Sequence, residues 1–255
     1  MRQLQQNSGI YLNNIDSTLF VILSCSKNLD TRADSILNTW AKHLNKVILS
    51  DSPKKMDEFI IGYNTSQSYQ GIQDKYINFF KNFDFTRAKY FFFVDDDTFV
   101  NIRNFKKLKL PKENKYFCIC RRLYLSESGL DLNGRDTGYP LQSITGKDSF
   151  LPLSHPSGGS GFILSQSSCF AIQSYLRDES LEDTIKSAHG DVSIGFWARK
   201  NKIKLIHCDR LWWSKPEVLR TDNFSKFTER SEQRAVTFHY LSPNEMYLFH
   251  KKLNI

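Results

Sequence analysis

The sequence predicts an α/β protein built on a Rossmann-like, mainly parallel sheet with helices on its faces. Short apolar runs alternate with segments of helical periodicity, which is typical of βαβ units. The chain opens as β-α-β, and a later apolar run ends in three adjacent aspartates at residues 95–97. Its 255 residues, 40% of them hydrophobic and 14% aromatic, suffice for a well-packed core.

The first part of the chain supplies most of the predicted parallel strands. An apolar run at Thr18–Ser24 predicts the first strand. Thr31 is the expected N-cap of a helix whose apolar positions continue through Trp40 to Leu44. The next expected elements are a strand at Lys46–Ser50, a strand at Ile60–Tyr63, a helix at 73–82 and a strand at Tyr90–Val94.

The second part of the chain is less regular. The elements expected there are a helix at 102–110, strands at Tyr116–Cys120, Phe162–Ser165 and Ile203–Ile206, and helices at 167–176 and within 187–201. Residues 126–157 are rich in Gly, Ser, Asp and Pro, and a long irregular segment of this kind often carries a binding function. No repeat or linker divides the chain, so we expect one domain of residues 1–255.

The net charge of +8 favours a nucleic acid, a membrane surface or a phosphorylated ligand as a partner. The basic residues are scattered, except for a lysine-rich stretch at Lys106–Lys115 that we interpret as a solvated face. No recognised nucleic-acid motif accompanies this stretch, so we expect no nucleic-acid partner.

The sequence also bears on the location of the protein and on the redox state of its cysteines. The apolar run Leu19–Leu23 is too short to cross a bilayer, and no signal-peptide pattern is visible. We therefore expect no transmembrane segment, and a cytoplasmic location if the chain is complete. The five cysteines are an odd, dispersed set without zinc-ligand spacing, which predicts reduced and mostly buried thiols.

The acidic triplet Asp95-Asp96-Asp97 is the most informative motif. Three adjacent carboxylates repel one another, and a divalent cation offsets that repulsion through hard oxygen ligands. Side chains alternate along a strand, so Asp95 and Asp97 are expected to point one way and Asp96 the other. At the carboxyl end of a strand, this pattern favours a metal–diphosphate site over a solvated acidic turn.

The chain contains four notable segments in this order: Thr31-Arg32-Ala33 with Trp40, Asp95–Val100, Ser157–Phe162 and Ala235–Tyr240. Together they resemble the Fringe and core 1 galactosyltransferase family of inverting β-1,3-glycosyltransferases. The resemblance covers about residues 18–253, and a fifth segment, His189–Gly195, is similar to the Fringe version. One departure is Ser160, where the family has a small residue in Gly-Gly-Ala-Gly.

This resemblance implies a GT-A fold and a metal-dependent transfer of a hexose, with galactose favoured, from a UDP-sugar to an acceptor hydroxyl in a β-1,3 linkage. The partners would be the UDP-sugar donor and a glycan or glycoprotein acceptor. Residues 18–125 would bind the nucleotide sugar, and residues 126–255 would bind the acceptor and carry catalysis. Animal members are anchored in the Golgi, so a catalytic portion of such a member would work in the Golgi lumen.

The resemblance also implies a metal centre. Asp97 and His239 would ligate Mn²⁺, and Asp95 is a further candidate ligand. Asp95 or Asp96 would hold the ribose and a metal-bound water. Oxygen ligands with one imidazole suit Mn²⁺ better than they suit a soft-ligand metal. Without the resemblance, His239 between two aromatic residues would be expected to be a core histidine.

Five further residues complete the candidate site, and each has a second interpretation. Asp191 matches the general base, but it is also a good N-cap for the helix that follows. Arg32 falls in the segment that meets the nucleotide, although it could simply pair with Asp34. Lys75 is a candidate phosphate ligand, although solvation is the commoner fate of a helix lysine. Gly158 and Gly159 would let the backbone approach the sugar closely, although Gly158-Gly159-Ser160-Gly161 alone could simply be a turn.

Two other functions compete with glycosyl transfer. A non-catalytic relative of chaperone or binding type would keep the fold without turnover, although retention of the triplet, Asp191 and His239 argues against it. A phosphotransferase of the haloacid dehalogenase class carries Asp-x-Asp-x-Thr after its first strand. Here Thr98 directly follows Asp97, and the strand is about the fourth, so that interpretation is weak.

Overall fold

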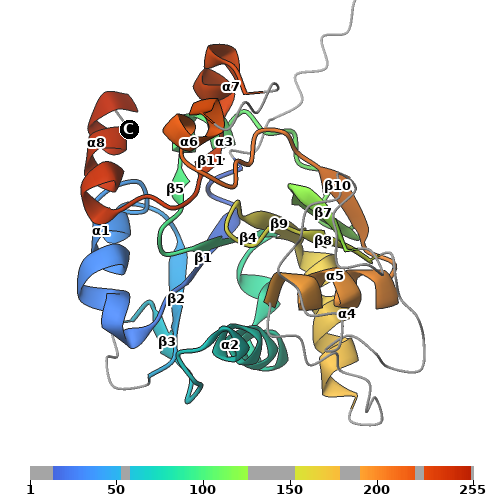
Figure 1. Cartoon of the computed structure of the whole chain (residues 1–255). Coiled ribbons are helices and arrows are strands. Elements are labelled where there is room, and N and C mark those ends of the chain that lie inside the picture. The colour runs from blue at the N-terminus through green and yellow to red at the C-terminus, as the bar shows by residue number, and fades with distance from the viewer. Residues whose placement is uncertain (1–13, 53–57, 126–152, 179–189, 222–226, 254–255) are drawn as a thin grey trace, which may run out of the picture.

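The computed structural model describes residues 14–52, 58–125, 153–178, 190–221 and 227–253. A seven-stranded sheet in the order β10-β6-β9-β4-β1-β2-β3 forms the centre, with helices on its faces (Figure 1). The strands are β1 (Thr18–Leu23), β2 (Lys46–Ser50), β3 (Ile60–Gly62), β4 (Tyr90–Asp95), β5 (Phe99–Val100), β6 (Phe117–Cys120), β7 (Arg122–Leu125), β8 (Leu153–Pro156), β9 (Phe162–Ser165), β10 (Lys204–His207) and β11 (Thr237–Phe238). The α-helices are α1 (Asp34–Leu37), α2 (Tyr69–Asn82), α3 (Ile102–Phe105), α4 (Gln166–Arg177), α5 (Gly190–Lys200), α6 (Pro216–Thr221), α7 (Glu229–Arg234) and α8 (Pro243–Leu253).

The seven-stranded sheet is mainly parallel, as predicted. Strands β3, β2, β1 and β4 pair in parallel, and β10 pairs in parallel with β6. Strand β9 is the antiparallel member, since it runs opposite to both β4 and β6. Two small antiparallel ribbons, β5-β11 and β7-β8, stand apart from the large sheet.

Both faces of the sheet are buried, which explains why its central strands are apolar at every position. Val21 and Phe93 pack into a core that contains residues of α2, α4 and α5. Phe20 and Phe92, one residue earlier on each strand, pack into a second core with residues of α1, α3, α6 and α8. Strands covered on both sides gain from continuous apolar runs, because no side chain faces water.

The helix predicted after β1 is much shorter than expected. The chain first forms a π turn at Leu29–Ala33, so Thr31 lies inside that turn and is not an N-cap. Helix α1 then lasts for only four residues. Asn38 donates its side-chain amide to the Asp34 carbonyl, and Thr39 donates its hydroxyl to the Ser35 carbonyl. Such side-chain bonds compete with the backbone ladder and end the helix early.

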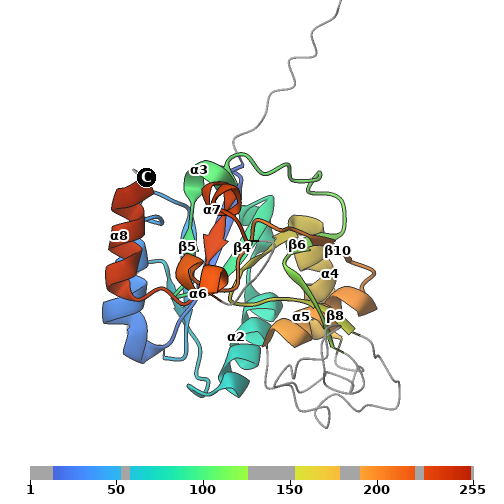
Figure 2. The same cartoon turned by 45° about the horizontal axis from the view of Figure 1, so that its top comes forward.

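The C-terminal part of the chain returns to the N-terminal half. Helix α8 lies against α1 in both views (Figure 1, Figure 2). Just before α8, β11 pairs with β5, so residues near position 239 reach the segment after β4. The structure therefore brings two sequence regions about 140 positions apart to the end of the same central strand.

Further predictions concern the helix after β5, the cysteines, membrane-spanning helices and the irregular segment. The helix expected at 102–110 is confined to α3, and the lysines between Lys106 and Lys115 are exposed as predicted. All five cysteines are unpaired, and three of them are buried. Among the described helices, none has both the length and the apolar character needed to cross a bilayer. Most of the irregular segment 126–157 lies outside the described residues.

Candidate functional site

A cleft of about 1040 Å³ opens at the carboxyl ends of β1 and β4. Open α/β sheets commonly bind ligands at this edge. Both halves of the chain contribute to its walls. All the residues selected from the sequence line it, namely Arg32, Lys75, Asp95, Asp96, Asp97, Gly158, Gly159, Asp191 and His239.

The acidic triplet divides its side chains between two environments, as the alternation predicted. Strand β4 ends at Asp95, and the next two residues form a turn. Asp95 and Asp97 face His239. Asp96 points away from them and accepts hydrogen bonds from the Ser24 hydroxyl at 2.7 Å and the Asn28 amide at 2.9 Å.

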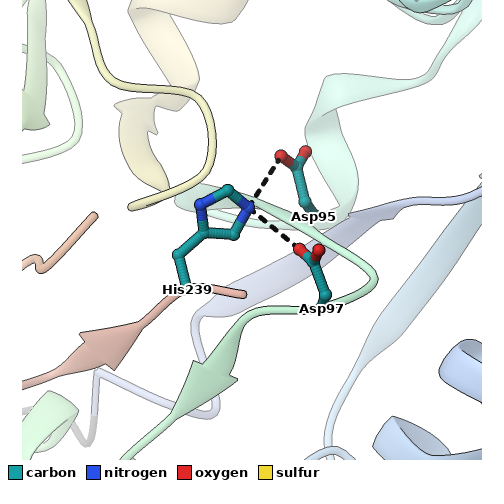
Figure 3. Close-up of side chains that lie close together, drawn as sticks. All are labelled: Asp95, Asp97 and His239. Atoms are coloured by element: carbon teal, nitrogen blue, oxygen red, sulfur yellow. Dashed lines mark ion pairs between the residues drawn. The ribbon is translucent and has the colours of Figure 1, made fainter. Parts of the chain in front are cut away.

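The β5-β11 ribbon places His239 beside the triplet. Phe238 pairs with Phe99, and the amide of Leu241 donates to the Asp97 carbonyl at 3.0 Å. The Nε2 atom of His239 lies 2.9 Å from Asp97 Oδ1 and 3.7 Å from Asp95 Oδ2 (Figure 3). The expectation of an ordinary core histidine is therefore wrong, because this imidazole faces two carboxylates.

Two contacts fix the orientation of the His239 ring. Its Nδ1 atom lies 3.3 Å from the Trp213 carbonyl, so a proton on Nδ1 leaves the Nε2 lone pair directed at the carboxylates. A Cβ added at Gly159 would overlap the ring and lie 2.6 Å from Nε2. Gly159 is thus required where the backbone passes the imidazole, a role that the sequence did not predict.

The raised pKa values of Asp95 and His239 indicate that the negative charge of the triplet is not fully compensated. The pKa of Asp95 is raised to about 7, mainly by burial, which His239 opposes and the nearby Asp97, Asp96 and Asp191 charges reinforce. Because 34% of the Asp95 side chain still faces the open cleft, water there limits the rise. Burial lowers the pKa of His239, but the Asp97 hydrogen bond and the two carboxylate charges outweigh this and raise it.

The residues present fit a divalent metal ion. One ligand atom from each of Asp95, Asp97 and His239 lies within 4.8 Å of the other two. Ligands about 2.1 Å from an octahedral ion lie about 3 Å apart in neighbouring positions, close to the observed spacing. Asp97 Oδ1 is buried and has no hydrogen-bond partner among the described residues beyond the nearby His239 Nε2. An ion at this point would neutralise the group that the fold leaves buried.

Arg32 pairs with the triplet instead of Asp34. Its Nη1 atom lies 3.4 Å from Asp96 Oδ1 and 3.2 Å from Asp97 Oδ2. The side chain is 44% exposed and lines the cleft, so it stands between the carboxylates and incoming ligands. Arg32 therefore balances part of the negative charge of the triplet and can also reach an anionic ligand in the cleft.

Lys75 is buried, so the expectation of a solvated lysine is wrong. It is 4% exposed, and its Nζ atom donates to the Ser24 carbonyl at 2.6 Å. Burial lowers its pKa, while Asp51, Cys25 and Asp96 partly oppose the shift. The ammonium group lines the wall of the cleft that β1 provides.

Asp191 lies in the first turn of α5, and its carboxylate is held at both oxygens. Oδ1 accepts from the amide of Val192 at 2.9 Å, and Oδ2 accepts from the amide of Gly158 at 3.1 Å. Asp191 is therefore not the N-cap of this helix, because α5 already includes Gly190 and the bonded Val192 amide belongs to the very next residue, whereas an N-cap accepts from an amide two or three residues on. A Cβ at Gly158 would lie 3.3 Å from the Asp191 Cβ, which shows how closely the glycine segment approaches.

Sequence reasoning missed several lining residues. His155 is fully buried on β8, and its Nδ1 atom lies 4.0 Å from Asp191 Oδ2. Ser24 was detectable, because it directly follows a strand that pairs in register with β4. For Trp212-Trp213 the sequence did not decide between a wall that faces the acceptor and a position in the core. Trp212 is buried in the second core, whereas Trp213 lines the cleft. Tyr240 also lines it, with a positive φ of 64°.

A sequence model of the Fringe-like family matches residues 13–252. The chain therefore belongs to the Fringe-like family. A sequence comparison with curated proteins gives no significant match. The family match covers all the segments on which the resemblance was based, and the mixed seven-stranded sheet flanked by helices agrees with the GT-A architecture that the resemblance implied.

Solved glycosyltransferases resemble the structure at low sequence identity. Apo-form GlyE of Streptococcus pneumoniae TIGR4 has a TM-score of 0.47 and 12% identity over 92% of this chain and 62% of that chain. A glycosyltransferase involved in glycosylation of the major capsid of PBCV-1 has a TM-score of 0.44 and 13% identity over 93% and 100%. The galactosyltransferase LgtC, in complex with donor and acceptor sugar analogues, has a TM-score of 0.45 and 11% identity over 93% and 96%. Likeness of this degree carries no information on activity, so the assignment to the family depends on the sequence match.

Proposed function

We propose that the protein is an inverting, metal-dependent glycosyltransferase that moves a hexose, with galactose favoured, from a UDP-sugar to an acceptor hydroxyl. The observation that carries this proposal is the convergence of Asp95, Asp97 and His239 on one wall of a cleft that also contains Asp191. Membership of the Fringe-like family supports the same reaction class. The β-1,3 linkage and Mn²⁺ come from the resemblance and belong to this proposal.

Asp95, Asp97 and His239 would hold the metal, which when bound supplies positive charge to the diphosphate leaving group. The Trp213 carbonyl keeps the Nδ1 side of His239 occupied and so presents Nε2 to the site. Arg32 and Lys75 line the same cleft and would add positive charge near the phosphates. Asp96, whose carboxylate accepts from Ser24 and Asn28, would accept from the ribose hydroxyls.

Asp191 would act as the general base. Inversion requires that the acceptor hydroxyl attack from the face opposite to the leaving group and lose its proton there. The Gly158 amide and the Val192 amide hold the carboxylate, so its direction is set before substrate binds. It remains accessible, since the Asp191 side chain keeps 17% of its surface exposed in the cleft.

The proposal is tested with UDP-galactose and other UDP-hexoses in the presence of Mn²⁺, with UDP release as the readout. We expect UDP release by the parent protein and its loss in Asp191→Asn, with UDP affinity preserved in that variant. Nucleotide binding without UDP release from any donor, across a panel of glycan acceptors, would support the non-catalytic binding-type relative instead. Failure to bind any UDP-sugar would contradict the proposal as a whole.

A further inference from the structure

Strand β7 places an arginine on the wall of the cleft, where the strand pairs with β8 of the second half of the chain. Arg122 begins this strand and lines the cleft, and its guanidinium lies over the Tyr124 ring, with Cζ 4.8 Å from the ring centroid. Its backbone amide donates to His207 Nδ1 at 3.2 Å, which fixes the start of the strand. The aromatic contact and the strand hold the guanidinium in place without neutralising it.

Arg122 differs from two other cations of the cleft, Arg32 and Lys75, in what surrounds it. Arg32 pairs with Asp96 and Asp97, and Lys75 donates to the Ser24 carbonyl. The Nε atom of Arg122, in contrast, is buried and has no hydrogen-bond partner among the residues that the structure describes. A buried donor without a partner is unfavourable, so this geometry favours a ligand that supplies an acceptor.

The position of Arg122 relates it to the proposed base. Arg122 pairs with Pro156 in the β7-β8 ribbon, and the amide of Ser157 donates to the Arg121 carbonyl at 2.8 Å. The next residue, Gly158, donates its amide to Asp191 Oδ2. The arginine therefore stands beside the segment that holds Asp191.

We propose that the acceptor substrate is anionic, with a carboxylate or a sulfate group that binds to Arg122 while its hydroxyl faces Asp191. This inference rests on the proposed function and specifies its acceptor. The planar guanidinium fork matches the paired oxygens of a carboxylate or sulfate, and charge-assisted hydrogen bonds of this kind are stronger than neutral ones. The excess of positive charge on the whole chain acts in the same direction.

The test compares sugars that differ in one charged group. The first pair is 4-nitrophenyl β-D-glucuronide with 4-nitrophenyl β-D-glucoside, and the second is methyl β-D-galactoside 6-sulfate with methyl β-D-galactoside. Binding of each sugar is measured by isothermal titration calorimetry of the protein saturated with Mn²⁺ and UDP. We expect the charged member of at least one pair to bind about tenfold more tightly than its neutral partner. A preference in the first pair indicates a carboxylate, and a preference in the second pair indicates a sulfate.

Three variants assign the preference to Arg122. Arg122→Gln should abolish it while UDP affinity and melting temperature stay unchanged, and Arg122→Lys should keep part of it. Lys27→Gln removes an exposed cation of the same cleft and should leave the preference intact. Equal binding of charged and neutral sugars by the parent, or an unchanged preference in Arg122→Gln, would overturn the proposal.

Failure of this inference can be separated from failure of the proposed function. Loss of UDP affinity in Arg122→Gln would place the arginine in the donor site and overturn the acceptor assignment. If the parent binds no UDP, the proposed function fails, and the sugar pairs still test Arg122 in the absence of nucleotide. In that experiment a lack of charge preference again counts against an anionic ligand.

Discussion

At the scale of single residues, the metal centre depends on the fit between a glycine and an imidazole. His239 reaches Asp95 and Asp97 only because the backbone at Gly159 leaves room for its ring. Trp213 then selects the nitrogen that faces the carboxylates. Neither contact follows from a sequence pattern, since the three residues lie in three different segments.

Gly159→Ala should therefore displace the His239 ring and weaken Mn²⁺ binding by tenfold or more. The new Cβ would overlap the imidazole, and overpacking of this kind costs about 1–3 kcal/mol of stability, so the fold should survive. Calorimetric titration with Mn²⁺ measures the affinity, and denaturant unfolding measures the stability.

Gly158→Ala is the matched control for that variant. Its Cβ would lie 3.3 Å from the Asp191 Cβ and would not overlap His239. We expect Mn²⁺ affinity close to that of the parent and a reduced rate of transfer. Equal loss of metal affinity in both variants would mean that the effect is general disturbance of the loop and not displacement of the imidazole.

Metal affinity should also rise with pH between about 6 and 8. The pKa of Asp95 is raised to about 7 and that of His239 is raised above its ordinary value, so both groups must release protons to bind a metal ion. Titrations with Mn²⁺ at pH 6, 7 and 8 measure this directly. An affinity that is constant or falls over this range would contradict the assignment of these ligands.

The same two shifts set the pH dependence of stability in the metal-free protein. Since both folded-state pKa values lie above the unfolded ones, the native state binds more protons between about pH 4 and the raised values. Stability should then fall as pH rises through this window. Asp95→Asn should make the fall smaller, which melting temperatures at pH 5.5 and pH 8 without metal would reveal.

At the scale of elements, the end of α2 is held by a side chain from α4. Gln173 is 7% exposed, and its Nε2 donates to the carbonyls of Phe80 at 2.9 Å and Phe83 at 3.0 Å. The last carbonyls of a helix lack partners within the helix, so this amide satisfies groups that would otherwise be buried and unpaired.

Gln173→Ala should destabilise the protein by about 2 kcal/mol, because it leaves buried carbonyls without a donor. Arg177→Ala is the control, since its bond to the Lys81 carbonyl is exposed and its loss should change stability by no more than about 0.5 kcal/mol. Denaturant unfolding of both variants gives the comparison. Similar values for the two would show that the buried amide has no special role.

Some strands and helices were predicted more accurately than others. Strands β1, β2, β4, β6 and β9 lie within a residue or two of their predicted ranges, because runs buried on both faces are distinctive. The predicted length of the helix after β1 was wrong because the side chains of Asn38 and Thr39 form hydrogen bonds with the backbone. Apolar periodicity does not reveal this local competition for backbone groups. Lys75 was expected in water because its burial depends on contacts with β1, which lies far away in sequence.

At the scale of the whole molecule, the cleft requires both ends of the chain. The triplet follows β4 of the central sheet, while His239 arrives through the β5-β11 ribbon just before α8. The resemblance to the family, applied position by position, had already assigned these residues to one metal centre. It did not predict Arg122, whose place in the cleft follows from the pairing of β7 with β8.

The most direct test of the account is thermal unfolding of the protein with UDP-, GDP- and CMP-sugars, each with Mn²⁺ or with EDTA. A ligand at 100 times its Kd stabilises the native state by about 2.7 kcal/mol, which raises the melting temperature by several degrees. We predict a rise with a UDP-sugar that disappears in EDTA and in Asp97→Asn. No rise with any nucleotide sugar, or a rise that persists in EDTA and in that variant, would contradict a metal-dependent donor site at Asp95, Asp97 and His239.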